Sequence, residues 1–154
     1  MTIRNSLLLT VLLILVGCSH PEKQKSDQDI PMSAYAQKLN ATKQTYPFDR
    51  WELRGNELEQ YSPENCARAA EVFDQLIADL AELGEAADEP LKMNAFRRAI
   101  EALNDLNQEN YGMLIESEEA EALCMLCNQI AIAAGLNPAR YGNGEGPASE
   151  WRDW

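Results

Sequence analysis

Residues 62–84 read SPENCARAAEVFDQLIADLAELG and carry the clearest structural pattern in the chain. Ser62 is a good N-cap, and Pro63 suits the first helical turn because its missing N–H would have no partner there. Gly84 favours a helix stop because glycine readily adopts a left-handed backbone. Between them, apolar residues recur every three or four positions: Cys66, Ala69, Ala70, Phe73, Leu76, Ile77, Leu80 and Leu83. This spacing predicts an amphipathic helix with one buried face.

Two further segments show the same period. One opens at Asp88-Glu89-Pro90 and ends among residues 107–110, and the other runs from Ser117 to Gly135. The connection at 84–88 is short, so the first two helices are expected to be antiparallel neighbours. The sequence therefore predicts an all-α fold, with a three-helix up-down-up bundle over about 62–135.

The flanks of this bundle are less regular. Residues 51–58 carry a weak hairpin signal around Gly55-Asn56, but that register would place Glu52 opposite Glu59, which is unfavourable. We therefore expect an irregular N-terminal wrap, with a short helix around 32–42 as a weaker expectation. The residues after Gly135 are expected to form a C-terminal tail.

The N-terminus has the layout of a secretory signal. Arg4 precedes an apolar run over 7–16, which is too short to span a bilayer, and Leu15-Val16-Gly17-Cys18 follows at its end. These residues resemble the lipobox signal peptide of bacterial lipoproteins. The resemblance implies cleavage before Cys18, a diacylglycerol on its sulfur and an acyl chain on its new amine. Ser19, rather than Asp, favours the outer membrane by resemblance to enteric lipoproteins.

The expected organisation has three parts. Residues 1–17 are the signal peptide, 18–33 carry the lipidated Cys18 and a polar tether, and 34–154 form a single acidic helical domain in the periplasm. The tether holds no apolar period and contains His20, the only histidine of the chain. A periplasmic location is oxidising, which permits disulfides.

Charge narrows the class of partner. The chain has 13 Lys and Arg against 25 Asp and Glu, a formal charge of −12. Such a surface repels nucleic acid and anionic lipid, and it attracts basic proteins. The candidate partner-binding residues are the glutamates opening the third helix and the two C-terminal tryptophans: Glu116, Glu118, Glu119, Glu121, Trp151 and Trp154. The alternative for the tryptophans, and for the aromatic stretch 46–51 with Tyr61, is that they fold back onto the bundle.

Three cysteines remain after lipidation. In an up-down-up bundle the first and third helices are parallel, and Cys124 lies nearer the start of its helix than Cys127. This predicts a Cys66–Cys124 disulfide, with Cys66–Cys127 as the alternative. Cys124-Met125-Leu126-Cys127 lies two turns inside a helix among glutamates, which disfavours a thioredoxin-like site.

The sequence offers no enzyme motif. The predicted domain lacks histidine, which excludes Ser-His-Asp and Cys-His sites, and it shows no phosphate-binding loop or metal-binding pattern. We expect no catalytic residue, metal or cofactor. The sequence instead favours an envelope lipoprotein with a protein-binding domain, such as an immunity or inhibitor protein against a periplasmic toxin or lytic enzyme. The alternatives are an assembly accessory of an envelope complex and, third, an enzyme or small-ligand binder.

Overall fold

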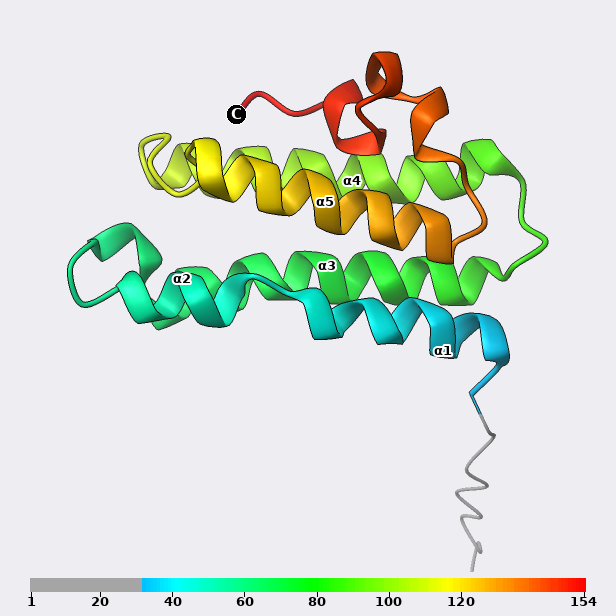
Figure 1. Ribbon diagram of the computed structural model, residues 1–154, viewed down its shortest axis with the longest axis horizontal. Helices are drawn as coiled ribbons and strands as arrows, with labels where there is room; N and C mark the ends of the chain where they lie inside the picture. Colours follow the sequence, from blue (N-terminus) through cyan, green and yellow to red (C-terminus); the bar gives the residue numbers. More distant parts are fainter. Residues whose placement is uncertain (1–31) are drawn as a thin grey trace, which may run out of the picture. The chain divides into compact units, whose positions relative to one another are not determined.

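Three long helices form where the sequence predicts them. The computed structural model describes residues 32–154, and in this range all regular elements are helical. The long helices are α3 (Pro63–Leu83), α4 (Glu89–Glu109) and α5 (Ser117–Ala133). Helix α3 packs along α4, and the order is up-down-up, with α3 parallel to α5 (Figure 1). The all-α prediction is confirmed.

The ends of α3 follow from local chemistry. Ser62 Oγ accepts a hydrogen bond from the Asn65 N–H at 3.2 Å, which satisfies one of the unpaired donors of the first turn. Gly84 has φ 84°, a left-handed conformation that a β-carbon would strain, and its N–H donates to the Leu80 carbonyl. The helix therefore begins and ends where its sequence signals lie.

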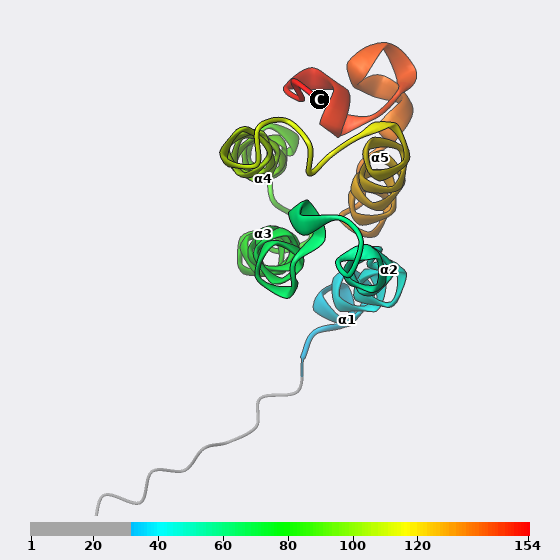
Figure 2. The same cartoon turned by 90° about the vertical axis from the view of Figure 1, so that its left-hand side faces the viewer.

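The short helix expected around 32–42 is present as α1 (Ala34–Ala41), and it is followed by the 3-10 helix η1 (Thr42–Thr45). The irregular wrap expected over 51–58 is wrong in its first half, because residues 51–54 belong to α2 (Phe48–Arg54). Helices α1 and α2 follow one another along α3 and complete a fourth side of the bundle (Figures 1 and 2). Burial of Leu39, Phe48 and Trp51, which are at most 5% exposed, explains why this segment is helical.

Helix α5 lies diagonally across the bundle from α3 (Figure 2). Its direct neighbours are α1, η1 and the C-terminal segment. The 3-10 helix η5 (Pro147–Glu150) packs against both α4 and α5, and Ala148 in it is 2% exposed. The predicted C-terminal tail therefore packs between two helices of the bundle.

Two buried polar side chains of α4 bind the backbone of the segments that connect the long helices. Lys92 is 4% exposed, and its ammonium donates to the carbonyls of Glu85 at 2.7 Å and Ala134 at 2.9 Å. Asn107 Oδ1 accepts from the N–H groups of Leu114 at 3.1 Å and Ile115 at 2.9 Å. Buried polar groups need such partners, so each side chain fixes the path of a loop that has no regular structure.

Candidate functional site

A buried ion pair ties the start of α5 to the end of α2. The Glu119 carboxylate is 1% exposed and accepts a hydrogen bond from the Arg54 guanidinium, which also lies 4.5 Å above the Tyr61 ring. Burial, and then the negative charge of Glu119, raise the pKa of Tyr61 to about 12. The predicted role of Glu119 in partner binding therefore needs correction, because Arg54 already occupies its carboxylate.

The pair brings together two acidic segments that are distant in sequence. Exposed glutamates of the α2–α3 connection lie at the same end of the bundle as those of the α5 N-terminus (Figure 1). We call this surface the acidic end. It comprises Glu52, Glu57, Glu59, Glu64, Glu116, Glu118 and Glu121. Three predicted residues, Glu116, Glu118 and Glu121, thus belong to a wider surface than the sequence indicated.

Large apolar side chains are exposed at the acidic end. Leu53 is 79% exposed, and the α4–α5 connection presents Tyr111 at 89% and Met113 at 48%. A hydrogen bond of 2.6 Å from Asn65 Nδ2 to Asn110 Oδ1 holds this connection beside the start of α3. Apolar and aromatic side chains that stand in water are typical anchors of protein interfaces.

Tyr111 is also unusual in its backbone. Its φ of 59° is left-handed, which costs energy for a residue with a β-carbon. The following Gly112 has φ 75°, and its N–H donates to the Asn107 carbonyl at 2.8 Å. The backbone turns at this helix end, and the Tyr111 side chain is left in solvent instead of packing on the core.

A hollow of about 440 Å³ adjoins Leu53. It lies at the corner between α2 and α3, and its lining combines carboxylates with apolar and backbone groups: Asp49, Glu52, Leu53, Gly55, Asn56 and Pro63. No lysine or arginine lines it. Its chemistry suits a cationic side chain with an apolar stem, such as lysine or arginine of a partner.

Most cations of residues 32–154 are engaged in contacts within the domain, which leaves its carboxylates in excess. Residues 32–154 contain ten Lys and Arg against 22 Asp and Glu. Eight of the ten form ion pairs, Lys92 binds backbone carbonyls, and Arg50 makes no ion pair. Between Arg98 and Arg140 the chain has no cation at all. Glu118 of the acidic end lies 3.8 Å from the Arg54 guanidinium, and the other six glutamates of this surface form no ion pair within residues 32–154.

The C-terminal tryptophans fold back onto the bundle instead of joining the acidic end. Trp151 and Trp154 are half-buried and pack against the core. The Trp151 carbonyl accepts a hydrogen bond from Asn104 Nδ2 at 2.9 Å, and the Arg152 guanidinium lies 5.7 Å from the Trp154 ring centre. The fold-back alternative describes this segment, so neither tryptophan is an exposed anchor.

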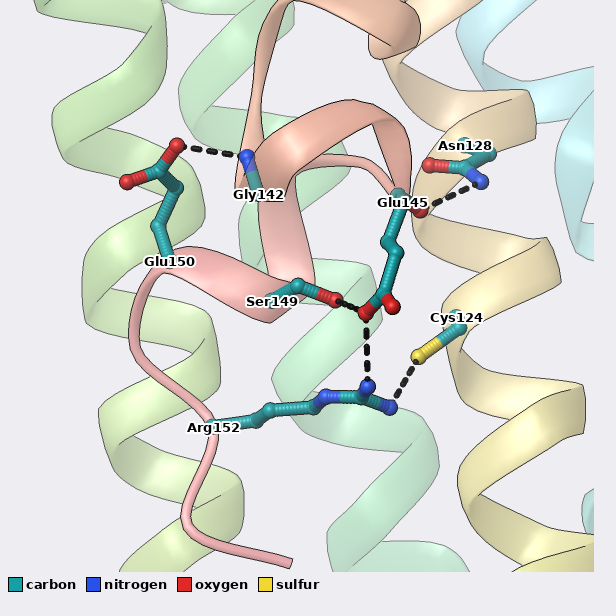
Figure 3. A network of polar contacts seen from close by, with 7 residues as sticks. All are labelled: Cys124, Asn128, Gly142, Glu145, Ser149, Glu150 and Arg152. Carbon is teal, nitrogen blue, oxygen red and sulfur yellow. Dashed lines mark hydrogen bonds and ion pairs between the residues drawn. The ribbon is translucent and has the colours of Figure 1, made fainter.

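A polar network secures the C-terminal segment on α5. Arg152 donates to Cys124 Sγ and to a Glu145 carboxylate oxygen, each at 3.0 Å (Figure 3). Ser149 Oγ donates to that same oxygen at 3.0 Å, and Asn128 Nδ2 donates to the Glu145 carbonyl at 3.1 Å. The Arg152–Cys124 contact is half-buried and the other three are exposed, and together they hold a segment that has little regular structure.

The predicted Cys66–Cys124 disulfide is not present, and residues 32–154 contain three free thiols. Cys66 Sγ lies 3.6 Å from the Tyr61 carbonyl, whereas Cys124 faces Arg152 in the C-terminal segment. The two cysteines lie on diagonally opposed helices, which the parallel directions of α3 and α5 did not reveal (Figure 2). Burial raises the pKa of Cys66 to about 11, and it raises those of Cys124 and the fully buried Cys127.

Comparisons with known proteins give no family. No protein-family model, curated protein or solved structure matched the chain. Among the residues that the structure describes, no cluster of three or more metal-ligating side chains occurs. None of the described helices is long and apolar enough to cross a membrane. Cys18 and the predicted tether up to residue 31 lie outside the described residues, whereas Ser33, placed at the end of the predicted tether, is the N-cap of α1.

Proposed function

We propose that this protein is a lipid-anchored component of the bacterial envelope whose helical domain binds a basic protein through the acidic end. The proposed location in the envelope rests on the lipobox resemblance at Leu15-Val16-Gly17-Cys18. Several acyl chains on one residue anchor a protein firmly, since each buried methylene contributes about 0.8 kcal/mol. Ser19 favours the outer membrane, with the domain in the periplasm.

The observation that carries the binding role is the pairing of unbalanced charge with exposed apolar anchors. Tyr111 and Leu53 are exposed at the same end of the bundle as seven exposed glutamates, while nine of the ten Lys and Arg of residues 32–154 are engaged in contacts within the domain. Complementary charge speeds encounter with a basic partner, and desolvated aromatic anchors supply affinity. An immunity or inhibitor protein against a basic toxin or lytic enzyme is the form of this function that fits best.

Anchoring is tested by labelling cells with radioactive palmitate. The full chain incorporates label, and Cys18→Ala abolishes both the label and the retention of the protein in the membrane fraction. A full chain that stays unlabelled and is recovered intact from the cytosol contradicts the anchor.

Binding is tested by photo-crosslinking in the same cells. A photoreactive amino acid at Tyr111 or Leu53 is expected to capture one discrete basic protein. Ile132, an apolar residue of α5 that is 64% exposed and lies outside the acidic end, serves as the matched control position. Equal capture from position 132, or none from 53 and 111, contradicts the proposed surface.

A further inference from the structure

A groove runs between α3 and α4 on the outer face of the bundle. Its volume is about 500 Å³. Small side chains make it hollow, because three of its lining positions on α4 are alanines at helical spacing: Ala95, Ala99 and Ala102. Val72, Leu76 and Leu106 line it as well, so much of the floor is apolar.

Two ion pairs cross the groove and define its length. Arg68 Nη2 lies 2.7 Å from Glu109 Oε2, and Arg98 Nη2 lies 2.6 Å from Asp79 Oδ2. The two pairs are eleven residues apart on each helix, so α3 and α4 advance in step along the groove. At 1.5 Å per residue the span is about 17 Å, or three turns of a docked helix.

The charge between the two crossings is negative. Asp79 is half-buried, and although burial favours its neutral form, hydrogen bonds from Arg98 and Gln75 hold its pKa below the usual value. Arg68 and Arg98 are each paired with a carboxylate of the groove, so neither offers a free positive charge. Glu71 and Asp105 also line the groove, one on each helix, and both are exposed without an ion-pair partner. The groove thus combines an apolar floor with uncompensated carboxylates on both rims.

We propose that this groove receives an amphipathic helix of a cationic protein, with its apolar face on the alanines and its Lys or Arg residues toward Glu71 and Asp105. A groove of this length between two antiparallel helices fits a helix. The Arg68–Glu109 crossing lies two residues before Tyr111, so the docked helix continues toward the acidic end. This inference rests on the proposed function, because it takes the ligand to be a basic protein. It adds that an amphipathic helix is the part of that protein that binds.

A second copy of the chain fits this groove less well. Each copy carries a formal charge of −12, and its α3–α4 rims would bring Glu71 and Asp105 against like charges. Charge complementarity therefore favours a basic partner over self-association.

The probe is an 18-residue peptide of leucine and lysine with leucine at helical spacing. The control peptide has the same composition in an order that gives no apolar face. Binding to the chain from residue 18 onward, with Cys18→Ser, is followed by ¹⁵N-resolved NMR and by fluorescence anisotropy. We expect saturable binding of the first peptide only, with shift changes concentrated at groove residues such as Val72, Ala99 and Ala102.

Variants distinguish binding in the groove from nonspecific electrostatic attraction to the acidic surface. Ala102 is exposed, so Ala102→Arg fills the groove without disturbing the core, and it should weaken binding more than tenfold. The pair Glu71→Lys and Asp105→Lys should weaken it about tenfold at low salt. Glu82→Lys with Asp88→Lys changes the net charge equally at exposed positions outside both the groove lining and the acidic end, and should weaken it less than threefold.

Three outcomes overturn the inference. One is equal binding of both peptides, and another is an equal loss of affinity in the two charge-reversed variants while Ala102→Arg binds normally. The third is concentration-dependent dimerisation that Ala102→Arg abolishes, which would assign the groove to a second copy. None of these outcomes decides the proposed function, because palmitate labelling tests the anchor and crosslinking from Tyr111 tests the acidic end.

Discussion

Replacing Arg54 by alanine should destabilise the folded domain by about 2 kcal/mol, because it leaves the Glu119 carboxylate buried without its partner. Breaking a fully buried ion pair costs about 3–5 kcal/mol. The Arg54 side chain is 38% exposed, so solvent screens part of that cost, although Glu119 is 1% exposed. Loss of the contact between Arg54 and the Tyr61 ring adds about 0.5–1 kcal/mol. The discounted total remains near 2 kcal/mol.

The assay is urea denaturation followed by circular dichroism, combined with a double-mutant cycle. In a Glu119→Leu background no charge is left unpaired, so Arg54→Ala should cost only about 0.5–1 kcal/mol from the ring contact. For a domain of this size, 2 kcal/mol corresponds to a fall in Tm of about 6–10 °C. An equal cost of Arg54→Ala in both backgrounds would refute the argument that the buried charge sets the penalty.

Three other changes test the rest of the fold. Asn107→Ala orphans the buried N–H groups of Leu114 and Ile115 and should cost about 2 kcal/mol in urea denaturation, whereas Asn107→Asp keeps an acceptor and should cost less; equal costs would contradict this role. Truncation after Ser149 removes Trp151, Arg152 and Trp154 and should lower the Tm, and an unchanged melting curve would show that the contacts of residues 150–154 do not stabilise the fold. Alkylation followed by mass spectrometry should modify half-buried Cys124 first. Cys66 and Cys127 should react readily only after unfolding, because both are buried and burial raises the thiol pKa of Cys66 to about 11. Fewer than three modified thiols among residues 32–154 after denaturation without reductant would contradict the free cysteines.

The long helices were predictable because their signals are local. Ser62, Pro63 and Gly84 delimit α3, and the structure places its ends at Pro63 and Leu83. The short helix α1 was expected, but α2 was missed because its seven residues are too few for a hydrophobic period to stand out. The helical state of α2 depends on burying Phe48 and Trp51 against α3, which is a tertiary effect.

The site was only partly visible in the sequence for a similar reason. The glutamates at the start of α5 were recognised as a surface, but the partner of Glu119 lies 65 residues away in α2. The burial of Lys92 and Asn107 does not follow from the sequence, because polar side chains are seldom buried unless the fold supplies partners. The groove depends on the register between α3 and α4, and the diagonal placement of α5 removes the expected disulfide; neither follows from periodicity.

Crosslinking with charge reversal tests the central claim most directly. A photoreactive residue at Tyr111 is introduced into the full-length, lipid-anchored chain, alone and together with Glu116→Lys and Glu121→Lys. The account predicts one discrete basic partner for the first protein and loss of that product in the charge-reversed protein, with both present in the envelope at equal amounts. An undiminished product after charge reversal, or a partner with an acidic surface, would contradict it.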